Sequence, residues 1–257
     1  MEILEFGNKE NKKIILIHGF QSPYQVWDEY IKYYEKDYNI IVTILSGHNP
    51  KNKEEFVSFK ECAKEIEDYF ISKYGNNVYA IYGMSMGGVL AATIWENKRL
   101  NIEKVVFDGS PLVSFNNFIK KFMIGFYINI TNKSKARDEK TLKQAINNII
   151  TKDKLDDLLQ VLDNMSDTTI TNYINNIGNF KLSDNIDTKN TEIYYYHGTK
   201  VNEMLAKKTA KYIKKYYPNS NIICFKGKGH CEHSLLNPKE MIKELDKILC
   251  VKMPRPC

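Results

Sequence analysis

The sequence has no paired-cysteine motif and no long apolar run, and these absences exclude several classes of protein. Its cysteines are odd in number, irregularly spaced and without a C-x-x-C pair, so neither a disulfide framework nor a zinc site is expected. No apolar run approaches the roughly 18 residues that span a bilayer, and the amino-terminal residues lack the pattern of a secretion signal. We therefore expect a cytoplasmic, reduced protein with no membrane span. The cysteines are Cys62, Cys224, Cys231, Cys250 and Cys257.

Arginine is scarce beside lysine, and the basic residues form no platform for nucleic acid. The chain has 37 Lys and Arg residues against 31 Asp and Glu residues, which gives a net charge of +6. The lysines are spread among acidic residues, with no arginine-rich stripe and no interleaved aromatic residues. We expect no nucleic-acid partner. The sequence leaves the oligomeric state open.

What is present is a series of short apolar runs, each followed by loop residues. In 257 residues, 43% of them hydrophobic, there is room for one large α/β domain or for a domain with an insertion. Continuous apolar runs that alternate with helical patterns predict a mostly parallel sheet flanked by helices, with residues 2–6 as an edge strand. The further predicted strands are 13–18, 38–45, 77–82, 104–107, 192–196 and 221–225. Helices are predicted at 53–73, 203–216 and 238–251.

The alternation of strands and helices is interrupted between residues 112 and 190, where no strand is predicted. This segment instead has several helical patterns, so we expect an all-helical insertion between two strands of one sheet. Residues 1–111 and 191–257 would then form the core, and 112–190 the insertion. Residues 139–177 of the insertion are more polar and rich in asparagine, which predicts a mobile lid. The helices expected in the insertion are 115–130, 140–150, 155–165 and 169–177.

A G-x-S-x-G pattern, Gly83-Met84-Ser85-Met86-Gly87, stands between a predicted strand and a predicted helix at 89–95. In this context the pattern is typical of a nucleophile elbow, a strained turn that raises the serine hydroxyl above the sheet. Glycines two residues to either side of the serine are expected because the strand and the helix pass very close together there. The sequence therefore predicts Ser85 as a nucleophile.

A serine hydroxyl needs a base within hydrogen-bond reach, and the base needs an acid that orients it. Among five histidines, His230 is the best candidate, because flanking glycines would let its loop reach back over the strand ends. His233 is a weaker candidate for the base, and His18 is expected to shape its own loop. We expect no metal site at His230, Cys231 and His233, because no convincing further ligand is evident. His48 and His197 are interpreted as loop and strand-end residues.

Together these motifs resemble the α/β-hydrolase family. The resemblance rests on His18-Gly19-Phe20, Ser46-Gly47-His48, the serine motif and Gly229-His230, and it spans nearly the whole chain outside 112–190. It implies an α/β-hydrolase fold with residues 112–190 as a helical cap. It also implies the chain order of nucleophile, acid and histidine, and an oxyanion hole formed by the backbone N–H groups of Phe20 and Met86.

The orienting acid departs from the commonest pattern of that family. In many relatives it lies three residues after the glycine that ends the penultimate strand, and that position here is Val201. Asp108 follows the strand after the nucleophile helix, where some relatives place the acid, and it is our preferred candidate. Glu203, two residues beyond the usual position, is the alternative. A weakened dyad remains a further possibility, and Asp28 and Glu232 are remote candidates.

The predicted function is that of a serine hydrolase without metal or organic cofactor. It would cleave a carboxylic ester or thioester of a small-to-medium apolar acyl group through a Ser85 acyl-enzyme. Aromatic residues at helical spacing in the insertion predict a pocket for this small-molecule acyl substrate, lined by Phe118, Phe122 and Phe126. One alternative is an inactive or weak member of the fold that binds a small molecule, supported by the missing acid at Val201. A peptidase or amidase is another.

Overall fold

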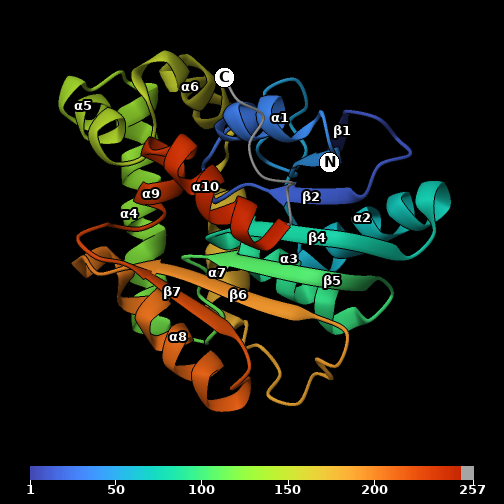
Figure 1. The fold of residues 1–257 in the computed structure, drawn as a ribbon. Helices are drawn as coiled ribbons and strands as arrows, with labels where there is room; N and C mark the ends of the chain where they lie inside the picture. Colours follow the sequence, from blue (N-terminus) through green and yellow to red (C-terminus); the bar gives the residue numbers. More distant parts are fainter. Residues whose placement is uncertain (250–257) are drawn as a thin grey trace.

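A central sheet of seven strands organises the computed structural model, which describes residues 1–249 (Figure 1). The strands lie in the order β1-β3-β2-β4-β5-β6-β7. The edge strand β1 is antiparallel to β3, and all other neighbours pair in parallel. The predicted mostly parallel α/β fold is therefore confirmed. The strand bounds are Glu2–Phe6, Lys13–Ile17, Asn39–Ile44, Asn77–Met84, Asn101–Asp108, Glu192–Gly198 and Asn221–Phe225, from β1 to β7.

Both faces of the sheet are covered, because alternate residues of the same strand enter different hydrophobic clusters. In β2, Ile15 and Ile17 belong to one cluster, whereas Ile14 and Leu16 belong to the other. One face packs against helices α2, α3 and α8, and the other against α1 and α10 (Figure 1). Continuous apolar strands follow from this double coverage. These helices span Phe59–Tyr74, Met86–Asn97, Met204–Tyr216, Asp28–Tyr34 and Pro238–Leu249.

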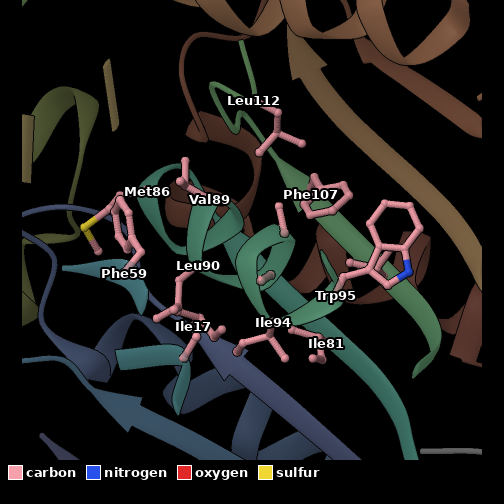
Figure 2. Packing of buried hydrophobic residues seen from close by; sticks show 14 of the residues in the cluster. Ile17, Phe59, Ile81, Met86, Val89, Leu90, Ile94, Trp95, Phe107 and Leu112 are labelled. Atoms are coloured by element: carbon pink, nitrogen blue, oxygen red, sulfur yellow. The ribbon is translucent and has the colours of Figure 1, made fainter. Parts of the chain in front are cut away.

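Helix α3 lies at the centre of the larger cluster. Figure 2 shows its apolar side chains, among them Val89, Leu90 and Ile94, packed against Ile17 and Phe107 of the sheet. Nearly every residue of this helix is buried, which explains why its sequence is apolar all round and not on one stripe. The helix that begins directly after Ser85 is thus held rigidly in the core.

Four helices stand between β5 and β6. Three of them begin at a polar side chain that accepts a hydrogen bond from the backbone three residues on: Asn116, Asp138 and Ser166. These caps place the helix starts within a few residues of the predicted ones. They are α4 (Asn117–Lys135), α5 (Glu139–Asn148), α6 (Leu155–Asn164) and α7 (Asp167–Asn179). Figure 1 shows the first three on the side of the molecule where the parallel strands end, and α7 packs against α4.

Tertiary contacts change two predicted boundaries. The helix expected from residue 53 begins only at Phe59, after the cap Ser58. The reason is that Phe56 leaves the helical path and stacks on Tyr173 of α7, with ring centroids 3.5 Å apart. The helix expected from residue 203 follows a short 3-10 turn, Val201–Glu203. Other short elements are the 3-10 turns Tyr24–Trp27 and Lys152–Lys154 and the helix α9, Glu232–Leu236.

The last predicted helix, residues 238–251, is present as α10 up to Leu249. Its predicted end, and two of the cysteines discussed above, Cys250 and Cys257, lie outside the described residues. Within residues 1–249, no helix combines the length and the apolar character needed to cross a bilayer.

Candidate active site

Ser85 occupies the sharp turn between β4 and α3. Its φ of +52° and ψ of −115° lie outside the regions that residues with a Cβ normally adopt. Such a conformation costs of order 1–3 kcal/mol and persists only where surrounding contacts enforce it. Here the Ser85 N–H donates to the Asp108 carbonyl at 2.6 Å, and the Ser85 carbonyl accepts from the Gly88 N–H at 3.0 Å.

The glycines of the motif are required by close approach of the backbone. A Cβ at Gly83 would lie 2.4 Å from the Gly87 carbonyl oxygen, and a Cβ at Gly87 would lie 2.3 Å from the Ile17 carbonyl oxygen. Neither position tolerates a side chain without a shift of the backbone. The G-x-S-x-G spacing therefore follows from how tightly strands β2 and β4 and helix α3 pass one another.

His230 lies in the loop after β7 and reaches the serine. Its Nε2 is 2.7 Å from Ser85 Oγ, although 145 residues separate the two in the chain. The loop rests on the end of β6: a Cβ at Gly198 would lie 2.1 Å from the Lys228 carbonyl, which accepts from the Thr199 and Lys200 N–H groups. These contacts place the imidazole over the strand ends, and its side chain remains 35% exposed.

Glu203 lies on the other side of the imidazole. Its Oε1 is 2.8 Å from His230 Nδ1, and its Oε2 accepts from the Gly198 N–H at 3.0 Å. The side chain is fully buried. Because a carboxylate only accepts hydrogen bonds, the shared proton belongs to Nδ1, which leaves Nε2 as the acceptor for the serine hydroxyl. The 3-10 turn after β6 directs Glu203 inward, whereas Val201 in the same turn is 90% exposed.

The preferred acid of the sequence analysis, Asp108, is not the group that faces the histidine. Its carboxylate accepts from the hydroxyls of Tyr82, at 3.0 Å, and Ser234, and no hydrogen bond joins it to His230 within residues 1–249. Burial raises its pKa to about 6, although both hydroxyls oppose that shift. The physical reason is strand alternation: Phe107 points to the α3 face, so Asp108 points to the α1 and α10 face, with Tyr82.

The remote acid candidates have other partners. Asp28 forms an ion pair with Lys154. Glu232 Oε2 accepts from Lys200 Nζ at 2.6 Å and from the Gly229 N–H at 2.8 Å, so it stabilises the histidine loop from outside. The ring of His233 packs against Phe225, with ring centroids 4.1 Å apart.

The two predicted oxyanion-hole donors lie next to Ser85. Met86 is the first residue of α3, and the N–H groups of a first helical turn have no acceptor within the helix. The loop of Gly19 and Phe20 passes close on the other side, since a Cβ at Gly19 would lie 3.5 Å from the Ser85 Cβ. The start of helix α3 and the loop of Gly19 and Phe20 thus both pass close to the serine.

Two buried histidines hold the Phe20 loop. His18 Nε2 accepts from the Leu45 N–H at 3.2 Å, and His48 Nε2 accepts from the Gln21 N–H at 2.9 Å. The rings lie 4.7 Å apart. Burial lowers the pKa of His18 to about 4 and that of His48 well below its ordinary value, so both stay neutral acceptors near neutral pH. His197 is remote from this pair and bonds through Nδ1 to the Gly198 carbonyl.

Helix α4 turns a different face to the core than its aromatic pattern predicted. Phe118, Phe122 and Phe126 are 80%, 68% and 50% exposed, so the expectation that they line an enclosed pocket is not met. The helix instead buries Thr131 and packs Tyr127 against Phe20 of the strand-end loop, with ring centroids 5.0 Å apart. These contacts could not be predicted from the sequence, because no local pattern links residues more than 100 positions apart.

No group of three or more histidine, cysteine, aspartate or glutamate side chains in the described part of the chain is arranged to hold a metal ion. The geometry instead connects one hydroxyl, one imidazole and one carboxylate in series. In that order the groups can pass a proton from the serine to the histidine and stabilise the resulting imidazolium.

The chain is similar to known proteins over most of its length. The family model of the PGAP1-like alpha/beta domain matches residues 21–193. The pimeloyl-[acyl-carrier protein] methyl ester esterase of Legionella pneumophila (strain Corby) is 23% identical over 222 residues, which cover 84% of this chain and 87% of the esterase.

Solved structures show the same fold. A carboxylesterase of the thaumarchaeon Nitrososphaera gargenis superposes with a TM-score of 0.75 at 13% identity, over 97% of this chain and 93% of its own. A lipase-esterase related protein of Clostridium acetobutylicum superposes with a TM-score of 0.70 at 22% identity, over 96% and 98% of the two chains.

Proposed function

The chain belongs to the PGAP1-like alpha/beta domain family and has the α/β-hydrolase fold, and on this premise we propose that it is an ester hydrolase with Ser85 as nucleophile. Its substrates would be carboxylic esters or thioesters of small-to-medium apolar acyl groups. One observation supports this above all: the hydrogen-bonded series from Glu203 through His230 to Ser85, with both distances below 3 Å. The esterase activity named for the Legionella relative agrees with it.

In the proposed first step, Ser85 Oγ attacks the acyl carbon and His230 Nε2 takes the hydroxyl proton. The imidazolium that forms is stabilised by Glu203, which accepts at Nδ1 and keeps the ring in the required orientation. The carbonyl oxygen becomes an oxyanion, and the N–H groups of Phe20 and Met86 would bind it. Removing one such donor typically costs about 3 kcal/mol of barrier, so these backbone groups are expected to supply a large part of the catalysis.

The tetrahedral intermediate then expels the alcohol or thiol, which takes the proton from His230 and leaves an acyl group on Ser85. Water enters, His230 removes a proton from it, and a second tetrahedral intermediate collapses to the carboxylic acid and free serine. His230 acts as base and then as acid in each half of the cycle.

Residues 112–190 are proposed as a cap over this site. Helix α4 supports the proposal through the contacts of Tyr127 with Phe20 and of Thr131 with Gln21, both at the carboxyl end of β2. A cap would shield the reacting groups from bulk solvent and contact the acyl group. The outward phenylalanines of α4 do not take part in that contact in this conformation.

The alternative of a non-catalytic binding protein loses its main argument. That argument was the absence of an acid at Val201, and Glu203 now stands at hydrogen-bond distance from the histidine. Peptidase or amidase action uses the same groups, and no contact in the site favours an amide over an ester.

The decisive experiment is labelling of Ser85 by a fluorophosphonate probe at neutral pH, with Ser85→Ala as the control, followed by a series of p-nitrophenyl esters of increasing acyl length. We expect one adduct, at Ser85, and hydrolysis that is abolished in the alanine variant. A folded wild-type protein that gives neither adduct nor hydrolysis would refute the proposal. The acyl length that is hydrolysed fastest then gives the preferred length of the acyl group.

A further inference from the structure

We propose that Gln21 is a positioning residue that couples helix α4 to the oxyanion-hole donor of Phe20, an inference that rests on the function proposed above. Gln21 follows Phe20 directly and has a φ of +59°, in the left-handed region. A residue with a Cβ is disfavoured there, so its conformation depends on the contacts that hold it.

The backbone of Gln21 is held from the core. Its N–H donates to His48 Nε2 at 2.9 Å, and His48 is 1% exposed. The neutral imidazole offers one acceptor in a fixed direction because its ring is enclosed between His18 and Tyr173, with ring centroids 4.7 and 5.1 Å away. This contact fixes the peptide plane between Phe20 and Gln21.

The side chain of Gln21 is held from helix α4. Its Nε2 donates to Thr131 Oγ1 at 2.7 Å, across 110 residues of sequence. Thr131 is fully buried, and its hydroxyl donates to the Tyr127 carbonyl at 2.7 Å, so it can only accept from Gln21. The Met165 sulfur lies 3.8 Å from the same amide nitrogen. The donor and the acceptor are therefore assigned for both hydrogen bonds, from Gln21 to Thr131 and from Thr131 to Tyr127.

Phe20 itself is also held by the inserted helices. Its ring contacts Tyr127 of α4 edge-on at 5.0 Å and Tyr173 of α7 at 5.2 Å. A displacement of α4 would thus move Phe20 and Gln21 together, and with them the N–H that is to bind the oxyanion beside Ser85. Since an oxyanion donor acts on the transition state and less on the bound substrate, the coupling should affect kcat more than KM.

The test uses three variants of the full chain. Gln21→Met keeps the length of the side chain but removes its donor, Thr131→Val removes the acceptor, and Thr131→Ser retains it. Steady-state hydrolysis of a p-nitrophenyl ester gives kcat and KM. A trifluoromethyl ketone of matching acyl length, which forms a hemiketal oxyanion on the serine, reports the oxyanion hole through its inhibition constant.

We expect kcat to fall about 10- to 100-fold in Gln21→Met and in Thr131→Val, because a misplaced group of this kind costs up to about 100-fold. The inhibition constant of the ketone should rise in parallel, while KM changes less than about 3-fold. Thr131→Ser should stay within about 3-fold of the wild type. The kcat of the double variant should be no lower than that of the less active single variant, because both substitutions remove the same hydrogen bond.

Gln25→Met is the matched control, because the Gln25 amide also joins the core to an inserted helix, donating to Asp157 Oδ1 of α6 at 3.0 Å. It should lower the thermal midpoint but leave the inhibition constant unchanged. If Gln21→Met lowers the midpoint as Gln25→Met does and leaves kcat and the inhibition constant within 2-fold, the coupling is refuted. An inactive, unlabelled wild type would instead refute the proposed function.

Discussion

Glu203 and Asp108 are both buried at the carboxyl ends of neighbouring strands, β6 and β5, yet they meet different groups. Glu203 faces an imidazole at 2.8 Å, whereas Asp108 faces the hydroxyls of Tyr82 and Ser234. Burial raises the pKa of Asp108 to about 6. A strand-end position alone therefore does not identify a triad acid. The face to which the strand directs the side chain, and the turn that follows, determine the partner.

The sharpest test of this comparison is activity. Glu203→Gln should lose roughly 10³- to 10⁴-fold in kcat at neutral pH, because the neutral amide no longer stabilises the imidazolium and can hold the wrong tautomer. Asp108→Asn should change kcat less than about 5-fold. Steady-state kinetics with one ester under identical conditions measures both. A larger loss in Asp108→Asn would reverse the assignment of the two carboxylates.

The second test is the pH dependence of stability. The folded state holds the Asp108 proton more tightly than the unfolded chain, whose ordinary pKa is 3.8. The tighter proton binding stabilises the folded state fully below pH 3.8, and this stabilisation is lost as the pH rises toward about 6. The unfolding free energy should therefore fall with increasing pH between these two values. The total is on the order of 3 kcal/mol.

Urea unfolding of the wild type and of Asp108→Asn at several pH values between 4 and 7 measures this contribution. Subtracting the unfolding free energy of the variant from that of the wild type removes the pH dependence of the titratable groups that both proteins contain. We expect the wild type to lose stability relative to the variant as the pH rises through this range. A difference that does not change with pH would contradict a raised pKa of Asp108.

Ser234→Ala should have a smaller effect, and on stability alone. The substitution removes one of the two hydroxyls that donate to Asp108, which leaves a buried carboxyl group with a single donor. We expect a loss of about 1–2 kcal/mol of unfolding free energy at neutral pH, with kcat within about 3-fold. Chemical denaturation and ester hydrolysis on the same preparation separate the two. A drop in kcat comparable to that of Glu203→Gln would show that Asp108 acts in catalysis.

The smallest effect is expected at Val201, the position where the resemblance to α/β-hydrolases led us to look for the acid. The Val201 side chain is 90% exposed to solvent, so Val201→Asp should leave kcat within about 2-fold. The same substitution in the Glu203→Gln background should not restore activity, which kcat measurements on the double variant will check. Restoration would mean that the turn after β6 can place either residue against the imidazole.

Local sequence patterns predicted the sheet, the elbow and the histidine loop because each depends on neighbouring residues. The glycines at 83 and 87 show this clearly: their close contacts with the Gly87 and Ile17 carbonyls leave no room for a side chain, so the pattern is visible in the sequence. The start of α2 was mispredicted because Phe56 gives up the helix to stack on Tyr173, more than 100 residues away.

Apolar periodicity and turn glycines are local properties, so they were sufficient to predict the parallel α/β architecture and to place Ser85 and His230 at strand ends. The acid that meets the histidine and the face of α4 that meets the core could not be predicted in this way. Both depend on the directions of side chains from segments distant in the chain. Glu203 and Asp108 both supply a carboxyl group after a strand. A 3-10 turn directs Glu203 to the imidazole, whereas the alternation of β5 directs Asp108 to two hydroxyls.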